Sequence, residues 1–188
     1  MKSNCLKLFT FSFSLLVFSF SYGQIYMADS CRVSFFSKTS MENIDAENTI
    51  SKPVMSIATG DIQISLSNQN FVFKSKLMQE HFNEDYMESE KYPHTVFKGK
   101  VNEKLDYKKD GVNHVTVTGV MDMHGVQKTI TIPGTITVQN SIIFLVAKFE
   151  AKMVDYNIKV PKALLVGNLS DHVSIDLTAT MKPYQVKN

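Results

Sequence analysis

The clearest pattern along the chain is an alternation of apolar and polar residues with a period of two. Within 114–123, for example, Val115, Val117 and Met121 occupy alternate positions and polar residues such as Thr116 stand between them. Successive side chains of a β-strand point to opposite faces, so this pattern predicts a strand with one buried and one solvated face. The same reasoning predicts strands at 25–38, 53–66, 71–73, 94–101, 130–138 and 173–181.

Two other segments complete the expected fold. The segment 142–153 is apolar at both odd and even positions as far as Phe149, which predicts a strand buried on both faces. The polar segment 39–51 is expected to be a loop or a short helical turn, and pairs such as Asp110-Gly111 indicate tight turns between strands. Long antiparallel strands joined by short turns are typical of a barrel or a sandwich. Strand length favours the barrel, so we predict an all-β, eight-stranded antiparallel β-barrel.

One stretch near the middle of the chain has a helical period instead. Met78, Phe82 and Tyr86 fall at i, i+4 and i+8, with Leu77 and Met87 beside the same stripe. This spacing predicts a short amphipathic helix of about three turns, whose acidic residues form the solvated side. A lone helix among strands must pack on the sheet or cover an open end of the barrel. We therefore expect its apolar stripe to line or close an interior space.

Residues 1–23 have the features of a secretory signal peptide. Lys2 and Lys7 precede an apolar run, and small residues stand before the expected cleavage site in front of Gln24. The run is short for a membrane-spanning helix. We expect a periplasmic or secreted protein, with a single domain over 24–188 and no stable membrane insertion after the signal is cleaved.

Charge and cysteine content narrow the range of partners. The chain has 20 basic and 18 acidic residues, and cleavage removes Lys2 and Lys7, so the mature protein is formally neutral. Nucleic-acid binding depends on basic side chains that neutralise phosphates, so no nucleic-acid partner is expected. Cleavage also removes Cys5 and leaves Cys31 as the single thiol. We expect Cys31 to be a buried apolar residue; the alternative is a free thiol that links two copies as a homodimer.

No residue pattern points to catalysis. His114, His124 and His172 fall on the polar faces of their strands, so they are not expected to converge on a metal ion. His81 and Glu84 lie one helical turn apart, a spacing that any solvated helix face can give. The sequence has no Gly-x-Ser-x-Gly motif and no inward pair of carboxylates for acid–base chemistry. We predict a binding protein rather than an enzyme, with no catalytic residue, metal ion or cofactor.

The inward faces of the predicted strands are almost entirely apolar. They carry Phe, Ile, Val, Leu and Met side chains, and Gly99, Gly119 and Gly134 stand at mid-strand on the same faces. Such glycines either relieve strain in a strongly coiled strand or leave a channel inside the barrel. A filled core and a hollow one use the same residues. Any ligand in the interior is expected to be apolar and elongated.

Three motifs in the chain form a recognisable set. They are LMQEHFNEDYMESEKYPHTVFKGKV at 77–101, VTGVMDMHGVQKTITIPG at 117–134 and FEAKMVDYNIKVP at 149–161. Together they resemble the YceI-like family of exported bacterial proteins, over roughly 25–183. The family's K-Y-P and H-G-V-T-K signatures correspond here to Lys91-Tyr92-Pro93 and to HGVQK at 124–128.

The resemblance implies a lipocalin-like barrel that binds a polyisoprenoid, such as an isoprenoid quinone or a prenyl diphosphate, in its interior. It implies a carrier rather than an enzyme. Many members carry Arg-Ser-Asp-aromatic-Gly after the penultimate strand, where this chain has KMVDYN at 152–157. Without the arginine, the resemblance supports a site for the apolar chain better than any specific head-group contact.

Two functions stay open at this point. The first is a carrier that holds a long apolar lipid inside the barrel, and the second is a packed barrel that acts as a stress or assembly factor through its surface, with no lipid ligand. For the first, the expected ligand-binding residues are the interior side chains Phe35, Phe71, Phe73, Met78, Phe82, Tyr86, Phe97, Gly99, Val117, Gly119, Met121, Ile132, Gly134, Leu145, Phe149, Ile175 and Leu177.

Overall fold

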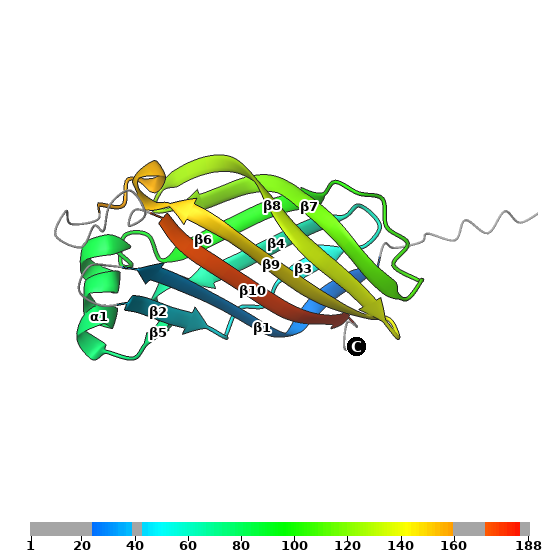
Figure 1. Cartoon of the computed structure of the whole chain (residues 1–188), viewed down its shortest axis with the longest axis horizontal. Helices are drawn as coiled ribbons and strands as arrows, with labels where there is room; N and C mark the ends of the chain where they lie inside the picture. The colour runs from blue at the N-terminus through cyan, green and yellow to red at the C-terminus, as the bar shows by residue number, and fades with distance from the viewer. Residues whose placement is uncertain (1–23, 39–42, 160–171, 185–188) are drawn as a thin grey trace, which may run out of the picture.

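Antiparallel strands make up most of the computed structural model, which describes residues 24–38, 43–159 and 172–184 (Figure 1). The expected signal peptide at 1–23 lies outside the described residues. The strands are β1 (Ile25–Lys38), β2 (Asn43–Asn48), β3 (Val54–Ser56), β4 (Asp61–Ser67), β5 (Val72–Phe73), β6 (His94–Val101), β7 (Gly111–Met123), β8 (Val126–Gln139), β9 (Ile142–Lys152) and β10 (His172–Pro183). The helical elements are η1 (Asn68–Asn70), α1 (Lys76–His81), η2 (Phe82–Tyr86) and η3 (Met153–Tyr156).

The predicted eight-stranded barrel is confirmed, and β1 is the strand that closes it. The sheet runs in the order β10-β9-β8-β7-β6-β4-β3-β1, and β1 pairs with β10 to complete the ring. β1 pairs with β3 only through Ile25–Met27, whereas its second half, Val33–Lys38, pairs with β2. β2 in turn pairs with β5. The two extra strands therefore branch from the barrel at one end.

The strand β2 corrects the prediction of a loop or helical turn at 39–51 for Asn43–Asn48, whereas 39–42 lie outside the described residues. Its sequence, NIDAEN, has little apolar alternation. It is nevertheless ordered as a strand because it pairs with six residues of β1, from Val33 to Lys38. Tertiary pairing can override weak local preference in this way.

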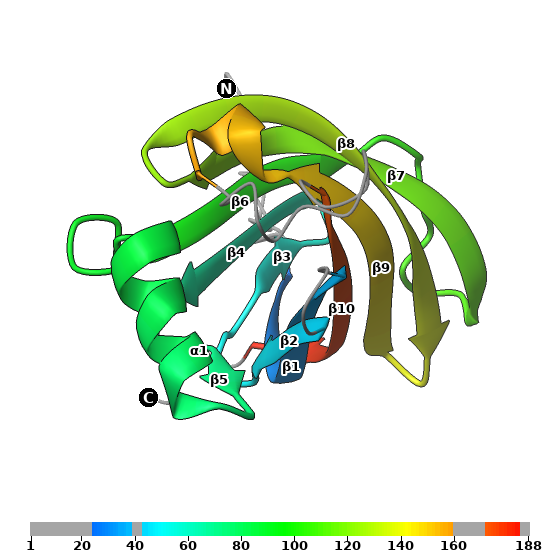
Figure 2. The same ribbon diagram turned by 60° about the vertical axis from the view of Figure 1, so that its left-hand side comes forward.

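The end of the barrel where β2 branches is only partly joined by backbone hydrogen bonds. Side chains bridge from this branch to β4: Asn48 Nδ2 donates to the Ser67 carbonyl at 3.0 Å, and Ser51 Oγ donates to the Ser65 carbonyl at 2.7 Å. The chain from β5 to β6 crosses this end as α1 and η2 (Figure 2). The barrel thus has a mouth at this end, covered on one side by the helix.

The burial of side chains on the strands follows the sequence prediction, with an exception on β9. Val115, Met121 and Met123 on β7 are buried, as the pattern predicts. The prediction that β9 is buried on both faces is wrong, because Phe144 and Val146 are 36% and 52% exposed. They lie on the outer surface of the barrel, where single exposed apolar residues are common.

The helix is shorter and less regular than three α-helical turns. Ser75 caps α1 by accepting a hydrogen bond from the Met78 amide, and after His81 the chain widens into the π-helical turn η2. In this turn the Met87 amide donates to the Phe82 carbonyl at 2.8 Å, a five-residue spacing. Met78, Phe82 and Tyr86 pack against the core as predicted, whereas Leu77 is 60% exposed.

Candidate functional site: an apolar cavity beneath the helix

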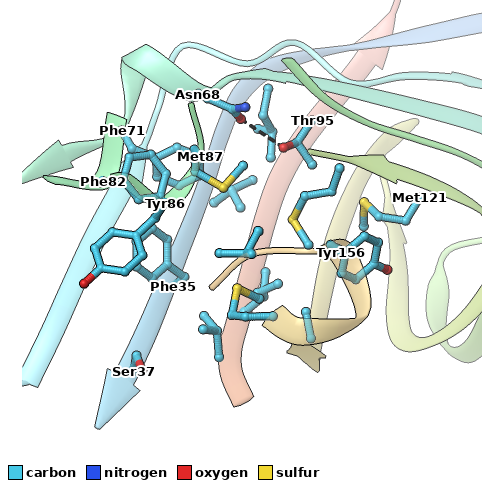
Figure 3. Close-up of a pocket in the computed structure, with 18 of the residues that line it drawn as sticks. Phe35, Ser37, Asn68, Phe71, Phe82, Tyr86, Met87, Thr95, Met121 and Tyr156 are labelled. Atoms are coloured by element: carbon cyan, nitrogen blue, oxygen red, sulfur yellow. Dashed lines mark hydrogen bonds between the residues drawn. The ribbon is translucent and has the colours of Figure 1, made fainter. Parts of the chain in front are cut away.

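A cavity of about 710 Å³ fills the half of the barrel next to the mouth. Its wall combines inward side chains from the strands, such as Val33, Ile64 and Ile175, with Met78 and Tyr86 from the helical segment. Figure 3 shows part of this wall, with Phe35, Tyr86 and Met121 around a common space. The residue types are mostly aliphatic or aromatic, so an occupant is held by shape and apolar contact rather than by charge.

Four phenylalanines fix the helical segment over this cavity. Phe82 lies against Phe35 of β1, with ring centroids 5.5 Å apart and planes 22° apart. It also contacts Phe71 at 5.6 Å and Phe73 at 5.0 Å. Offset and edge-on contacts at these distances are favourable beyond the area they bury. This aromatic cluster of Phe35, Phe71, Phe73 and Phe82 joins the helix to the β1–β2–β5 branch.

Tyr86 shows how apolar this part of the site is. Burial raises the pKa of its phenol, and the nearby Asp85 charge adds to the effect. Both effects favour the neutral hydroxyl over the phenolate. The Tyr86 ring forms part of the cavity wall beside the aromatic cluster (Figure 3).

Two buried polar side chains in the wall, Asn68 and Thr95, are satisfied within the protein. Asn68 is fully buried, and its Nδ2 donates to the Tyr92 carbonyl at 2.7 Å. Thr95 Oγ1 donates to Asn68 Oδ1 at 2.9 Å (Figure 3). Buried polar groups paired in this way carry no desolvation cost that a ligand must offset. The Asn68–Thr95 pair leaves the wall effectively apolar.

Among the described residues that line the cavity, the charged ones gather at the mouth. Lys128 Nζ lies 2.9 Å from Asp155 Oδ2 and 5.9 Å from the centre of the Tyr156 ring. The hydrogen bond and charge of Lys128, with smaller contributions from Lys152 and His172, lower the pKa of the Asp155 carboxyl. Asp155 is therefore an ionised partner that orients Lys128, and not a proton donor near neutral pH.

His124 corrects the prediction of an outward-facing histidine. The side chain is buried between the mouth elements, with Nδ1 3.0 Å from the Tyr156 carbonyl oxygen and Nε2 2.9 Å from Glu88 Oε2. Its ring packs on Tyr92 at 4.4 Å between centroids. His124 lies in the turn between β7 and β8 with φ of 53°, so the chain leaves the strand and the alternation no longer gives its direction. It ties the end of the helical segment to η3 and is not a metal ligand in this arrangement.

The described residues contain no group of three or more His, Cys, Asp or Glu side chains arranged to hold a metal ion. Among these same residues, no helix is long and apolar enough to cross a membrane. The cavity wall consists mainly of unreactive side chains. The chemistry that this arrangement supports directly is the enclosure of an apolar molecule.

Sequence comparison identifies the family. The family model described as the YceI-like domain matches residues 16–181 of this chain. The chain belongs to the YceI-like domain family. No curated protein matches it.

Solved structures share the fold of this YceI-like chain at low sequence identity. A polyisoprenoid-binding domain from Saccharophagus degradans, described as implicated in plant cell wall breakdown, superposes with a TM-score of 0.71 at 15% identity, covering 85% of this chain and 98% of that one. BcnA from Burkholderia cenocepacia gives a TM-score of 0.65 at 17% identity, covering 80% and 95%. The YCEI protein of Campylobacter jejuni gives 0.55 at 15% identity, covering 99% and 100%.

The cavity of the YceI-like barrel brings together most of the interior residues predicted from the sequence. Those that line it are Phe35, Phe71, Phe73, Met78, Phe82, Tyr86, Phe97, Met121, Ile132, Phe149, Ile175 and Leu177. The predicted residues that the cavity does not reach are Gly99, Val117, Gly119, Gly134 and Leu145. All five lie farther from the mouth, where the barrel is packed.

The mid-strand glycines allow close packing rather than a channel. A Cβ atom at Gly99 would lie 2.7 Å from the Phe97 ring, and one at Gly134 would lie 2.9 Å from the Val146 carbonyl oxygen. The space left by the missing side chains is thus already occupied. Of the two interpretations of these glycines, the structure favours relief of strain in a strongly coiled strand over an open channel.

Many other lining residues were not in the predicted set, and three of them are polar or aromatic groups that bear on the chemistry of the site. Lys128 has the same strand parity as Ile130 and Ile132, so the alternation could have placed it on the inward face of β8. Asn68 and Tyr156 also line the cavity but lie in short 3-10 turns. No periodic signal in the sequence marks a buried side chain in such a turn.

Proposed function

We propose that this protein is an exported carrier that holds a polyisoprenoid, or a similar long apolar lipid, inside the barrel. The observation that carries the proposal is the apolar cavity of about 710 Å³ beneath the helix. This volume falls within the range of roughly 300–1,000 Å³ that is usual for ligand pockets. A packed barrel that works only through its surface needs no such space. The polyisoprenoid-binding domain with the same fold supports the choice of ligand class.

The energetics suit a reversible carrier. Burying a prenyl chain gains about 0.8 kcal/mol per CH₂ group relative to water. A membrane offers the same chain an equally apolar environment, so most of this gain cancels when the lipid comes from a bilayer. The net affinity then depends on shape fit in the cavity and on contacts at the mouth. Moderate affinity allows the carrier to release its lipid.

The mouth carries charges of both signs in near balance. Lys128 can donate a hydrogen bond to a carbonyl oxygen, while Asp155 already balances its charge at 2.9 Å. Glu150 lies 3.6 Å from His172, and Lys152 also lines the cavity. A diphosphate needs a surplus of positive charge, which this balance does not supply, whereas a quinone carbonyl needs only a single donor. Among polyisoprenoids, we therefore favour an isoprenoid quinone over a prenyl diphosphate.

The direct test is to extract lipid from the purified protein. Protein isolated from its own host without detergent is extracted with organic solvent, and the extract is analysed by mass spectrometry. We expect an isoprenoid lipid at close to one molecule per protein, and its mass distinguishes a quinone from a diphosphate. Extracts without any lipid, from protein that is folded by circular dichroism, would contradict the proposal.

A pair of tryptophan variants provides the control. Ile175→Trp adds bulk inside the cavity, and Val146→Trp adds the same group on the exposed outer surface. We expect Ile175→Trp to reduce the amount of extracted lipid and to shift it towards shorter chains, and Val146→Trp to change neither. Identical lipid amount and chain length in both variants would place the lipid outside the barrel.

Export is part of the same proposal and is tested separately. The signal-like segment at 1–23 predicts removal of the N-terminus before Gln24. Osmotic shock of the host cells, followed by N-terminal sequencing of the released protein, measures both location and cleavage. A protein retained in the cytoplasm with Met1 intact would contradict export and would leave the lipid test unaffected.

A further inference from the structure

The cavity ends at one level of the barrel on neighbouring strands. Val33 of β1 and Leu177 of β10 are paired across the strands, and both line the cavity. The next inward-facing pair away from the mouth, Cys31 and Ala179, is buried and does not line it. The cavity therefore has a floor at the level of Val33 and Leu177.

Phe97 completes this floor from the opposite side of the barrel. Its Cε1 and Cζ atoms would lie 2.7 Å from a Cβ atom at Gly99, so the ring extends along β6 over the glycine and away from the mouth. The absent side chain of Gly99 thus provides the space that the ring occupies. Because Phe97 lines the cavity and Gly99 does not, the ring separates the hollow half from the packed half.

Beyond the floor, large side chains fill the barrel. Tyr26, Met55, Ile143 and Met181 are each 2% exposed or less. In the described part of the chain, the deep wall of the cavity thus ends against a solid core. A linear ligand that enters at the mouth reaches a blind end.

The volume of a blind cavity limits the length of chain that it can enclose. Each non-hydrogen atom occupies roughly 30 Å³ in a liquid, which is the volume share of one water molecule. The cavity of about 710 Å³ therefore holds roughly two dozen such atoms. An isoprene unit contributes five carbons, so this corresponds to about four to five units. Additional units must stay outside the mouth.

We propose that the floor formed by Phe97, Val33 and Leu177 selects linear prenyl chains of about four to five isoprene units, or apolar chains of similar carbon number. This inference rests on the proposed function, because it names the length of the chain that the carrier encloses. Shorter chains leave part of the cavity unfilled and lose dispersion contacts. In longer chains the extra units lie outside the barrel and lose the apolar environment that a membrane would give them, so these chains stay in the vesicles.

The test is a competition among chain lengths. Lipid-free protein is incubated with phosphatidylcholine vesicles that carry an equimolar mixture of linear prenols differing by one isoprene unit. The protein is then separated from the vesicles, and the retained prenols are quantified by mass spectrometry. We expect the retained distribution to peak at about four to five units, with at least about a threefold preference over prenols two units shorter.

Variants of the floor should move this peak in opposite directions. Phe97→Ala removes the six ring carbons, about the volume of one isoprene unit, and is expected to move the peak up by about one unit. Leu177→Phe adds bulk at the same level and is expected to move it towards shorter prenols. Phe144→Ala makes the same change as Phe97→Ala on the outer surface, away from the cavity, and should leave the peak in place.

The outcomes of these experiments distinguish failure of the chain-length inference from failure of the proposed function. A peak that shifts with Phe97→Ala or Leu177→Phe, and not with Phe144→Ala, supports the floor as the length selector. Should Phe97→Ala fail to fold, Leu177→Phe alone decides. A flat length distribution, or a peak that neither floor variant moves, overturns the inference while lipid binding stands. If the wild-type protein retains no prenol at all, the proposed function fails first.

Discussion

Gly119 and Gly99 bring two strands of the barrel wall unusually close. The two glycines are directly paired between β7 and β6. A Cβ atom at Gly119 would lie 2.3 Å from the Lys98 carbonyl oxygen and 2.4 Å from Gly99 Cα. Both neighbours are backbone atoms, which cannot rotate away as a side chain can. Only glycine fits this position without moving a strand.

The first prediction is that Gly119→Ala destabilises the protein. Because the methyl group must displace backbone, we expect a loss at the upper end of the about 1–3 kcal/mol that overpacking costs. Urea unfolding measures the change. Gly111→Ala, on the same strand, is the matched control, since no atom lies within 4 Å of the added Cβ, and it should stay within about 0.5 kcal/mol of the wild type. Equal stability of both variants would contradict the close approach.

Cys31 gives a second prediction at the residue scale. Its side chain is buried in the barrel wall, and burial raises the pKa of the thiol to about 11. We therefore expect very slow reaction of the folded protein with Ellman's reagent at pH 8, and fast reaction in urea. Rapid labelling of the native protein would contradict this burial. The same burial argues against a homodimer linked through Cys31.

The raised thiol pKa also has a consequence for stability. An unfolded cysteine ionises near pH 8.5, whereas the folded thiol holds its proton to about pH 11. The stabilising effect of the protonated thiol is present below about pH 8.5 and is lost as the pH rises towards 11. Cys31→Ala should therefore flatten the decrease of stability between these values, as measured by urea unfolding across the range.

At the scale of elements, the helical segment is fixed to the barrel mainly by Phe82. Its ring contacts Phe35, Phe71 and Phe73, which lie on β1 and around β5. The π-helical turn that begins at Phe82 brings Met87 into the buried wall at its other end. Since α1 has no buried residue of its own, its position depends on this anchor.

The third prediction is that Phe82→Ala loosens α1 more than it loosens the barrel. We expect a loss of about 1–3 kcal/mol in global stability, because the ring is only partly buried. Amide hydrogen exchange should increase several-fold in 76–87 and little in β7 or β8. Leu77→Ala on the same helix, at a side chain 60% exposed, should change neither. Uniform loosening of all elements would show that Phe82 supports the core and does not anchor the helix.

The elements also show what the sequence can and cannot predict. Strands such as β7 were predictable because each has one buried and one solvated face, and this alone produces the alternation. The strand β2 was not predictable, because it forms through pairing with β1 and not through a pattern in its own sequence. The apolar outer positions Phe144 and Val146 led to a wrong prediction of burial for β9, because apolar character permits burial without requiring it.

For the molecule as a whole, the barrel divides into a packed half and a hollow half. Both halves have the same kinds of apolar residue on their inward faces. The alternation in the sequence therefore predicts which residues face inwards, but it does not predict how far the cavity extends. Two features that have no periodic signal set that extent. One is the branch that β2 forms by pairing with β1 from Val33 onwards. The other is the ring of Phe97, which lies over Gly99.

The fourth prediction concerns the response of the whole barrel to its ligand. A lipid that binds only the folded state stabilises it by RT ln(1 + [L]/Kd), about 2.7 kcal/mol when the free lipid is at 100 times Kd. With a short prenol such as farnesol, thermal unfolding followed by circular dichroism should show a Tm that rises with each increase in prenol concentration. Ile175→Trp, which narrows the cavity, should weaken the concentration dependence, whereas the outer variant Val146→Trp should keep it in full. A Tm that is independent of prenol in the wild-type protein would instead favour a barrel that acts through its surface, with the hollow half as an unfilled space.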